Sequence, residues 1–259
     1  MNSRLLTQTV YLARRSVLRT ARQPAVLIPA FLFPMLLFIL QGANLDRAAD
    51  LPGFPADSYF AFLLTFPLIQ GVLFSAVSAG TDIADDIESG FMNRLSMTPM
   101  NSAALLVGQL FGVVVLGIAQ AAFYLAVGAV LGVDIKAGIP GILLVLLYGA
   151  VTALGFGGIG AILALRTGSG EAVQGLFPLL FVVVFLSNIL LPLDLIGAGW
   201  FQTVATYNPI SYLVQGIRSL IITGWEPQKV LIGFVVSGAI LIVGITGAAF
   251  SLKERLART

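Results

Sequence analysis

The residue types available for chemistry in this chain are few, because its 259 residues include no histidine and no cysteine. It therefore lacks the usual zinc ligands, a thiol nucleophile and the side chain that titrates near neutral pH. None of Lys136, Lys229 and Lys253 stands in a GxxxxGK[ST] phosphate-binding loop. No Ser–His pair and no paired carboxylates lie within an apolar run. We expect no catalytic residue, no metal site and no cofactor bound by the chain itself.

The composition indicates a membrane protein. Hydrophobic residues make up 58% of the chain and charged residues 10%, whereas soluble domains carry about 25% charged residues. Long uncharged apolar runs predict an all-α membrane protein with six transmembrane helices. The expected spans are about 24–43, 58–80, 102–131, 140–165, 172–193 and 229–251. No acidic or basic residue falls well inside them, which disfavours an ion-coupled carrier with a protonatable group near the membrane midplane.

Small residues at four-residue spacing recur in two of these spans. Gly108 and Gly112 lie in the third span, and Gly149, Gly157 and neighbouring alanines lie in the fourth. Such spacing lets helix backbones approach closely. We expect these faces to pack against other helices.

Residues 3–22 are predicted to form an amphipathic helix at the membrane interface. Leu6, Val10, Ala13, Val17 and Ala21 share one face of a helical wheel, and Arg4, Arg15, Arg19 and Arg22 share the opposite face. We expect this helix to lie along the inner leaflet, with its arginines near anionic lipid headgroups. Most of the basic residues fall in this segment, in the inner loops and in the C-terminal tail, which predicts that both termini are cytoplasmic. The basic excess is a topology signal and gives no support to nucleic-acid binding.

The segment 194–228 is too polar in its middle for a lipid-facing span. Gln202, Thr203, Asn208 and Pro209 interrupt its apolar residues, and irregular backbone of this kind is disfavoured in lipid. We expect a re-entrant segment on the outer side, between spans five and six. Trp200 and Tyr207 favour the headgroup level.

The inner loop over residues 82–101 is the informative hydrophilic piece. Asp82, Asp85, Asp86 and Glu88 precede Gly90, and a short amphipathic stretch with Phe91, Met92, Arg94 and Leu95 leads to Pro99. Acidic residues favour the start of a short helix because they complement its dipole, and Pro99 bars the helix from continuing. A docking helix for another protein and a solvated turn both fit these residues.

Polar residues inside the spans are candidates for a substrate path. They are Gln70 and Ser75 on the second span, Gln109, Gln120 and Tyr124 on the third, and Asn188 on the fifth. Polar groups are unfavourable toward lipid, so these side chains are expected to face other helices or a cavity. Hydrogen bonding between helices is favoured over ligand contact for each of them.

Two segments resemble the ABC-2 type transporter permeases, especially the daunorubicin-resistance-type drug exporters. They are IESGFMNRLSMTPMNSAALLVGQL, which begins at Ile87, and YNPISYLVQGIRSLI, which begins at Tyr207. Together with the six-span pattern, the resemblance covers nearly the whole chain as one permease domain, 1–259. It implies that residues 82–101 form a cytoplasmic coupling loop, with Glu88, Gly90, Phe91, Arg94, Leu95, Thr98 and Pro99 in contact with an ATPase. It also implies that 194–228 closes the path on the outer side, with Trp200, Tyr207, Asn208, Pro209 and Arg218.

The function implied by this resemblance is that of a plasma-membrane permease subunit that exports a hydrophobic or amphiphilic compound. Two copies of a separate cytosolic ABC ATPase would bind ATP and Mg, and a second permease subunit would complete a homodimer or heterodimer. The chain alone would then not be an enzyme. An exporter of polysaccharide or lipid-linked glycan is the nearest alternative. An ion-coupled secondary transporter and a non-transporting membrane scaffold are alternatives of different classes.

Overall fold

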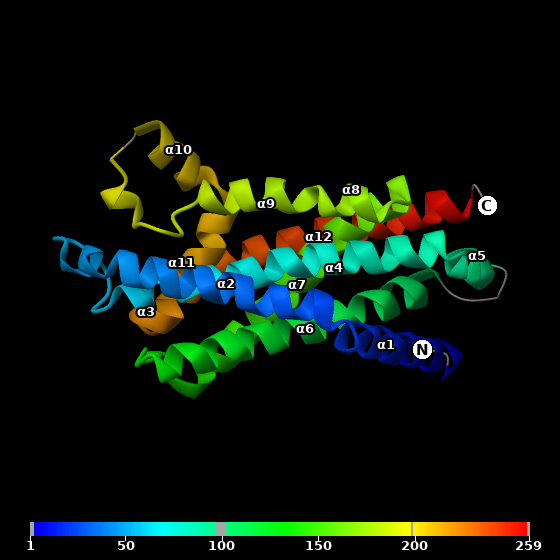
Figure 1. Cartoon of the computed structure of the whole chain (residues 1–259), viewed down its shortest axis with the longest axis horizontal. Helices are drawn as coiled ribbons and strands as arrows, with labels where there is room; N and C mark the ends of the chain where they lie inside the picture. Colours follow the sequence, from blue (N-terminus) through cyan, green and yellow to red (C-terminus); the bar gives the residue numbers. More distant parts are fainter. Residues whose placement is uncertain (1–2, 97–101, 198, 258–259) are drawn as a thin grey trace.

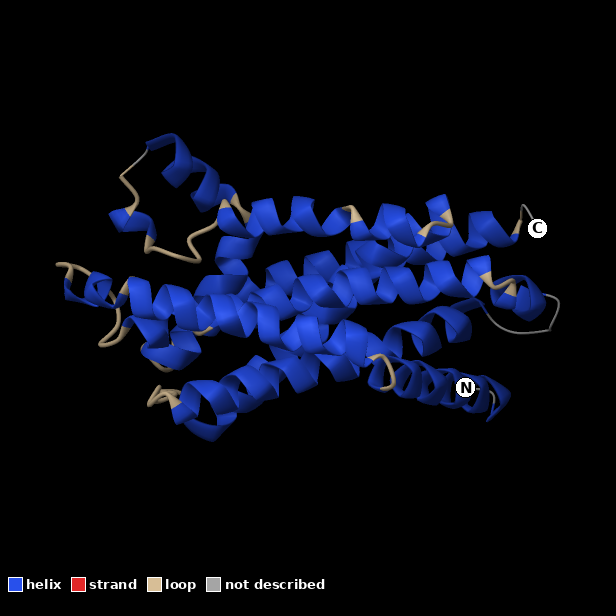
Figure 2. Cartoon of the chain, viewed as in Figure 1, coloured by secondary structure: helices blue, strands red, loops and turns tan. Residues whose placement is uncertain are grey.

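The computed structural model describes residues 3–96, 102–197 and 199–257, and it describes side chains over 9–92, at Arg94, and over 105–197 and 199–257. These residues form helices joined by turns, with no strand in the described ranges (Figure 2). The described chain ends lie at one end of an elongated bundle together with α5 (Phe91–Ser96), and we call this the terminus end (Figure 1). At the other end, the distal end, lie α3 (Tyr59–Leu63) and α10 (Gly199–Tyr207).

Five of the predicted spans correspond to helices that are long and apolar enough to cross a membrane. These are α2 (Pro24–Asn44), the α3–α4 stretch Tyr59–Glu88, α6 (Ser102–Val130), α7 (Gly138–Thr167) and α12 (Pro227–Leu256). The α3–α4 stretch is mostly buried, whereas α2 and α12 expose large apolar side chains. Exposed apolar faces of this kind suit contact with lipid. The all-helical membrane class expected from composition is therefore confirmed.

The fifth predicted span, 172–193, is a broken and shorter element. It begins with α8 (Gly170–Gln174), continues after Gly175 as α9 (Leu176–Phe185) and gives way to turns before the short 3-10 helix η2 (Leu193–Leu195). The sixteen residues from Gly170 to Phe185 cover about 24 Å at 1.5 Å each, less than the ~30 Å of a hydrocarbon core. The helix thus ends before the predicted boundary at 193.

The second predicted span also differs from expectation at both of its ends. It is interrupted at Leu64, between α3 and α4 (Thr65–Glu88), close to Pro67, which lacks a backbone N–H. Beyond residue 80, α4 continues for about two further turns, to Glu88. The expectation that the acidic residues of 82–88 begin a short helix is wrong, because they occupy the last turns of α4.

Close backbone contacts of α7 hold the centre of the bundle together. A Cβ atom built on Gly160 would overlap the backbone carbonyl of Ala76 on α4, and one built on Gly158 would lie 2.6 Å from the carbonyl carbon of Gly244 on α12. Gly149 approaches Gly117 of α6 in the same way. Small residues at these crossings let α7 contact three neighbours. Gly149 belongs to the spacing predicted from the sequence, whereas Gly158 and Gly160 lie outside that pattern.

The polar segment after α9 folds back into the bundle at the distal end. Its last helix, α11 (Pro209–Ile222), is mostly buried and packs against α12. The 3-10 helix η1 (Asp46–Asp50), after α2, lies at the same end. α11 is too short to cross a membrane, as expected for a re-entrant element.

We predict that Gly160→Ala destabilises the purified protein by about 1–3 kcal/mol, the usual cost of overpacking, because the new methyl group would overlap the Ala76 carbonyl. The measurement is thermal unfolding in detergent. Gly238→Ala on α12 is the matched control, since nothing lies within 4 Å of its added Cβ. Equal melting temperatures for Gly160→Ala and the wild type would contradict the close α4–α7 contact.

Candidate functional site

The terminus end is organised around α1 (Ser3–Ala21), which packs along α6. Added Cβ atoms at Gly108 and Gly112 would collide with Leu12 and Ser16 of α1. The Ser16 hydroxyl donates to the carbonyl oxygen of Gln109 at 2.7 Å and accepts from the N–H of Gly112 at 3.2 Å. The prediction that Gly108 and Gly112 pack against another helix is therefore confirmed, and that helix is α1.

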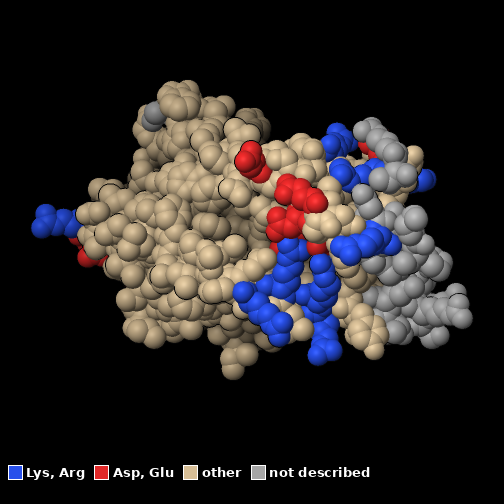
Figure 3. All heavy atoms as spheres, turned by 45° about the vertical axis from the view of Figure 1, so that its right-hand side comes forward, with Lys and Arg blue, Asp and Glu red and all other residues tan. Residues whose placement is uncertain are grey.

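Two arginines of α1 form ion pairs with the acidic end of α4. Both terminal nitrogens of Arg15 donate hydrogen bonds to the carboxylate oxygens of Asp86, at 2.7 and 2.9 Å. Arg19 contacts Asp86 at 2.7 Å, Asp85 at 2.7 Å and Asp82 at 2.9 Å. Gln109 of α6 adds a hydrogen bond to Asp86 at 3.1 Å. Figure 3 shows the acidic side chains gathered beside basic ones on this face.

Asp86 is the centre of this cluster, because its side chain is only 5% exposed and receives bonds from α1 and α6. Its place in the last turns of α4 puts a negative charge near the negative end of the helix dipole, which is unfavourable. The two guanidinium groups offset that cost with charge-assisted hydrogen bonds. The hydrogen bond to Asp86 raises the pKa of Arg15.

The expected orientation of α1 is partly wrong. Arg15 and Arg19, assigned to lipid headgroups, face the acidic cluster. Val10, assigned to the apolar face, is 56% exposed, and an exposed apolar side chain suits contact with lipid. A helical wheel shows only which residues share a face of one helix. It contains no information on the carboxylates that α4 brings next to α1.

The short helix α5 of the predicted coupling loop is fixed by intramolecular contacts of Phe91 and Met92. Met92 is buried in a cluster with residues of α4, α6 and α7. The Arg15 guanidinium lies 4.0 Å from the ring centroid of Phe91, a cation–π contact. Arg94 is exposed and donates to the Ser89 carbonyl at 3.4 Å. Phe91 is thus partly covered by α1, and Met92 makes the intramolecular anchor.

The remaining predicted coupling residues have varied environments. Glu88 ends α4, and its carboxylate accepts from the N–H of Gly170 at 3.4 Å, at the start of α8. Gly90 has φ = 69°, a left-handed conformation that favours glycine in the turn before α5. The side chain of Leu95, and all of Thr98 and Pro99, lie outside the described residues.

Most of the predicted substrate-path residues make hydrogen bonds within the protein. Gln120 and Tyr124 both donate to the carbonyl oxygen of Ala30 on α2, at 3.2 and 3.0 Å. Ser75 donates to Gly71 of its own helix at 3.2 Å. Gln109 belongs to the acidic cluster. Their roles in a path stay predictions, and their observed partners are those expected of packing residues.

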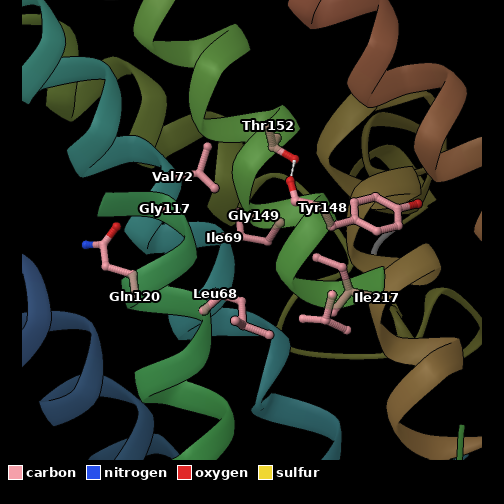
Figure 4. Close-up of a pocket in the computed structure, with 11 residues that line it drawn as sticks. Leu68, Ile69, Val72, Gly117, Gln120, Tyr148, Gly149, Thr152 and Ile217 are labelled. Carbon is pink, nitrogen blue, oxygen red and sulfur yellow. Dashed lines mark hydrogen bonds between the residues drawn. The ribbon is translucent and has the colours of Figure 1, made fainter. Parts of the chain in front are cut away.

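The cavity next to Gln120 is too small for a substrate. It lies between α4, α6 and α7, it measures about 10 Å³, and Gln120 and Tyr148 are among its lining residues (Figure 4). The Thr152 hydroxyl is hydrogen-bonded to the Tyr148 carbonyl rather than to a ligand site. A volume of this size holds about one water molecule.

Gln70 differs from the other candidates because both of its amide atoms are buried without a hydrogen-bond partner. It lies on α4 one turn from Phe66 and one turn from Phe74, so the three residues share a face. Phe66 packs on Phe185 of α9, with ring centroids 5.8 Å apart. Phe74 contacts phenylalanines of both α2 and α9. The unsatisfied amide of Gln70 therefore lies on the same face of α4 as two phenylalanines that contact α2 and α9.

The predicted outer-side residues separate into exposed and buried groups. Trp200 and Tyr207 on α10 are 68% and 78% exposed. Asn208 caps α11 by accepting from the N–H of Ile210 at 2.9 Å, and it donates to the Val183 carbonyl of α9 at 2.7 Å. Pro209 occupies the first turn of α11, which its fixed φ favours.

Arg218 of α11 is the buried cation of the distal end. Its guanidinium donates to the carbonyl oxygens of Phe62, Asn188 and Ile189 and, at 3.4 Å, to the Thr65 hydroxyl. It also stacks on the Phe62 ring, 3.5 Å from the centroid. One side chain therefore joins α11 to the α3–α4 break and to the turns after α9.

The sequence-based list of coupling residues missed Arg15, Arg19 and Asp86. The available signal was charge complementarity: five arginines in the first 22 residues and a run of acids over 82–88. Pairing these two charged segments required the knowledge that α1 crosses α6 next to the end of α4.

Fold and site together define a helical membrane protein with no metal-ligand cluster among its described residues. Its most organised polar region joins an interfacial helix to a short helix at the end of a membrane span. The family profile described as "ABC-2 type transporter" matches residues 7–222. The chain belongs to the ABC-2 type transporter family, and it is a transport permease rather than a catalytic subunit.

Several curated relatives carry permease names. The chain is 27% identical over 211 residues to a Cyanophora paradoxa protein named as a transport permease, ycf38, an alignment that covers 81% of this chain and 72% of the relative. It is 23% identical over 223 residues to a Mycobacterium tuberculosis protein named as a doxorubicin resistance ABC transporter permease, DrrC, covering 85% and 78%. A ycf38 permease of Pyropia yezoensis is 27% identical over 222 residues, covering 83% and 74%.

We predict that Asp86→Asn loosens α1 from the bundle, because it removes the charge that Arg15, Arg19 and Gln109 share. The expected loss is about 1–3 kcal/mol, below that of a fully buried pair because Arg15 is 39% exposed. Limited trypsin digestion should then cut within α1 faster than in the wild type. Asp85→Asn is the control, since Asp85 is 55% exposed and binds Arg19 alone. Equal cleavage rates in both variants would contradict the central position of Asp86.

Proposed function

We propose that this chain is the membrane-spanning subunit of an ATP-driven exporter of hydrophobic or amphiphilic compounds. ATP and Mg would be bound by two copies of a cytosolic ABC ATPase, and a second permease subunit, identical or related, would complete the path. ABC-2 permeases normally work with ATPase partners. The observation that carries the proposal is the fixed position of α5, which Met92 and Arg15 attach to the end of the most buried span.

The proposed topology has six crossings, with both termini in the cytoplasm and the chain in the plasma membrane. The fifth crossing would be α8 and α9 completed by the turns over 186–192. Arg14 and Arg22 at the terminus end, together with Arg94, Arg166 and the basic residues of the C-terminal tail, support a cytoplasmic location by the positive-inside rule. The terminus end would then meet the ATPases.

The proposed energy transfer runs through the unit formed by α1, α5 and the end of α4. Closure of two ATPases on nucleotide must move a rigid element that is seated in their surface. A displaced α5 would act on α4 through Met92, and on α1 through the contact of Phe91 with Arg15. Arg94 and Glu88 would supply the charges at the rim of the ATPase contact.

The proposed substrate class follows from the aromatic face around Gln70. Phenylalanines of α2, α4 and α9 offer apolar contact, and the unsatisfied amide of Gln70 offers two N–H donors and an oxygen acceptor for a polar group of the cargo. The doxorubicin resistance in the name of the DrrC relative agrees with an amphiphilic cargo of this kind. These features favour an amphiphile over a polysaccharide.

The overall proposal is tested by reconstituting the chain with its ATPase in liposomes and following an amphiphilic dye. We expect dye movement that requires ATP and the ATPase. Movement without the ATPase that stops when ion gradients are dissipated would indicate an ion-coupled carrier. Movement of a lipid-linked glycan but not of the dye would indicate a glycan exporter.

We predict that Arg94→Glu weakens binding of the ATPase subunit at least tenfold, or about 1.4 kcal/mol, because it reverses an exposed charge on α5. Phe91→Ala should reduce ATP-dependent dye movement, since it also removes the ring that Arg15 covers. Both variants should insert in the membrane normally. Lys136→Glu, on the exposed loop before α7, is the control. Wild-type co-purification and transport in both variants would reject α5 as the coupling helix.

We predict that Gln70→Leu raises the melting temperature, because it removes two buried polar atoms that have no partner. The same variant should slow dye export at least about tenfold, as expected when a stabilised site loses a functional polar group. Thr81→Val is the control, since the Thr81 hydroxyl on the same helix is already bonded to the Val77 carbonyl. Unchanged export by Gln70→Leu would remove Gln70 from the path.

A further inference from the structure

A cavity at the distal end contains polar groups that the protein leaves unsatisfied. It measures about 290 Å³ and lies between α11, the start of α12 and the turns after α9. Arg218, Asn188 and Lys229 are among its lining residues. Drug-sized ligands occupy roughly 300–1,000 Å³, so this cavity suits a headgroup or another small polar group.

Arg218 brings a buried positive charge to this cavity. The residue is only 7% exposed, and among the described side chains no carboxylate forms an ion pair with it. Its four hydrogen bonds to protein oxygens use four of the five guanidinium N–H groups. A buried cation without an anionic partner is costly, and a negative group of a ligand would lower that cost.

Asn188 supplies a second, independent unsatisfied group. It is 3% exposed, and its Oδ1 atom is buried without a hydrogen-bond partner. The hydrogen bonds that hold this residue in place use its backbone: its N–H donates to the Ser211 hydroxyl, and its carbonyl accepts from Arg218. Its side chain is therefore not needed for those contacts. A buried acceptor of this kind requires a donor, either a water molecule or a ligand hydroxyl.

The other charges of the cavity are arranged so that they leave the positive site at Arg218 free. Glu226 is paired with Lys229 at 2.6 Å and accepts from the Thr223 hydroxyl. Asp194 is a further lining residue and is exposed. The lining therefore contains one cation without an ion-pair partner, Arg218, together with Asn188, whereas the charge of Glu226 is offset by Lys229.

We propose that this cavity binds the headgroup of an anionic amphiphile that combines a phosphate ester with a hydroxyl group. The phosphate would accept from Arg218, and the hydroxyl would donate to Oδ1 of Asn188. A glycerophosphate headgroup has both groups, whereas phosphocholine has the phosphate but no donor. The binding does not depend on ATP-driven transport, so it stands or falls separately from the proposed function.

The experiment measures binding to the full chain in detergent micelles without added lipid. The probes are short-chain phosphatidylglycerol, short-chain phosphatidylcholine and glycerol 3-phosphate, and the readouts are calorimetric affinity and thermal shift. We expect phosphatidylglycerol to bind at least about tenfold more tightly than phosphatidylcholine. Equal affinity for glycerol 3-phosphate would support the site and assign it a soluble ligand. Weaker binding of glycerol 3-phosphate would support the site and assign it a lipid.

Two variants separate binding from structural support. Asn188→Leu should leave the melting temperature unchanged or raise it, because it removes a buried atom without a partner, and it should weaken phosphatidylglycerol binding at least about tenfold. Gln215→Trp should fill the cavity without touching the bonds of Arg218, and it should weaken binding similarly. Thr203→Trp, a bulky change on exposed α10, is the control.

Any of four results would overturn the proposal. The first is equal affinity for the two lipids, which would indicate general surface adsorption. The second is wild-type phosphatidylglycerol affinity in both Asn188→Leu and Gln215→Trp. The third is a lower melting temperature for Asn188→Leu with unchanged binding, which would assign Asn188 a purely structural role. No binding of any probe would indicate a cavity that holds water only.

Discussion

Contact between α7 and its neighbours is the constraint on which the rest of the bundle depends. Gly160 lies against the Ala76 carbonyl and Gly158 against Gly244, so the backbones of α4, α7 and α12 meet without intervening side chains. Lipid provides little hydrophobic driving force between helices, so close van der Waals contact must hold them together. Because α4 is fixed by this contact, both of its ends have fixed positions. One end carries the acids that α1 contacts, and the other carries Thr65, to which Arg218 of α11 donates. The two candidate regions are therefore connected through one helix.

The buried charges at the two ends of α4 differ in sign and in how completely they are paired. At the terminus end, Asp86 is a buried anion that two arginines and a glutamine satisfy. At the distal end, Arg218 is a buried cation surrounded by carbonyl oxygens and an aromatic ring, without a described carboxylate partner. A fully hydrogen-bonded charge network makes the local structure rigid. A buried charge without a counter-charge favours binding of a ligand that carries the opposite charge. This contrast is consistent with a coupling role at one end and a binding role at the other.

Much of the fold could be predicted from the sequence, and the failures have identifiable causes. Uninterrupted apolar runs located five spans, since hydropathy is a local property. The fifth predicted span was too long, because apolar residues after Phe185 form turns that α11 and Arg218 support. The acidic residues of 82–88 were assigned to the start of a helix rather than to its end. The carboxylates of Asp82, Asp85 and Asp86 are stabilised there by a guanidinium group of α1, some 65 residues earlier in the sequence.

The sequence by itself determined that the protein lies in lipid, that it is helical and that it resembles the permease family. It also determined the absence of histidine and cysteine chemistry. All of these follow from composition and short-range pattern. The sequence also identified Gln70, Gln120 and Asn188 as polar residues that need partners, and the family resemblance marked Arg218. Only the tertiary structure decided which of them are satisfied. The Nε2 group of Gln120 donates to a carbonyl oxygen on α2, whereas the Oε1 atom of Gln120, both amide atoms of Gln70 and the Oδ1 atom of Asn188 have no partner. Hydrogen-bond satisfaction depends on groups brought together from distant parts of the chain, and no local pattern encodes their distances.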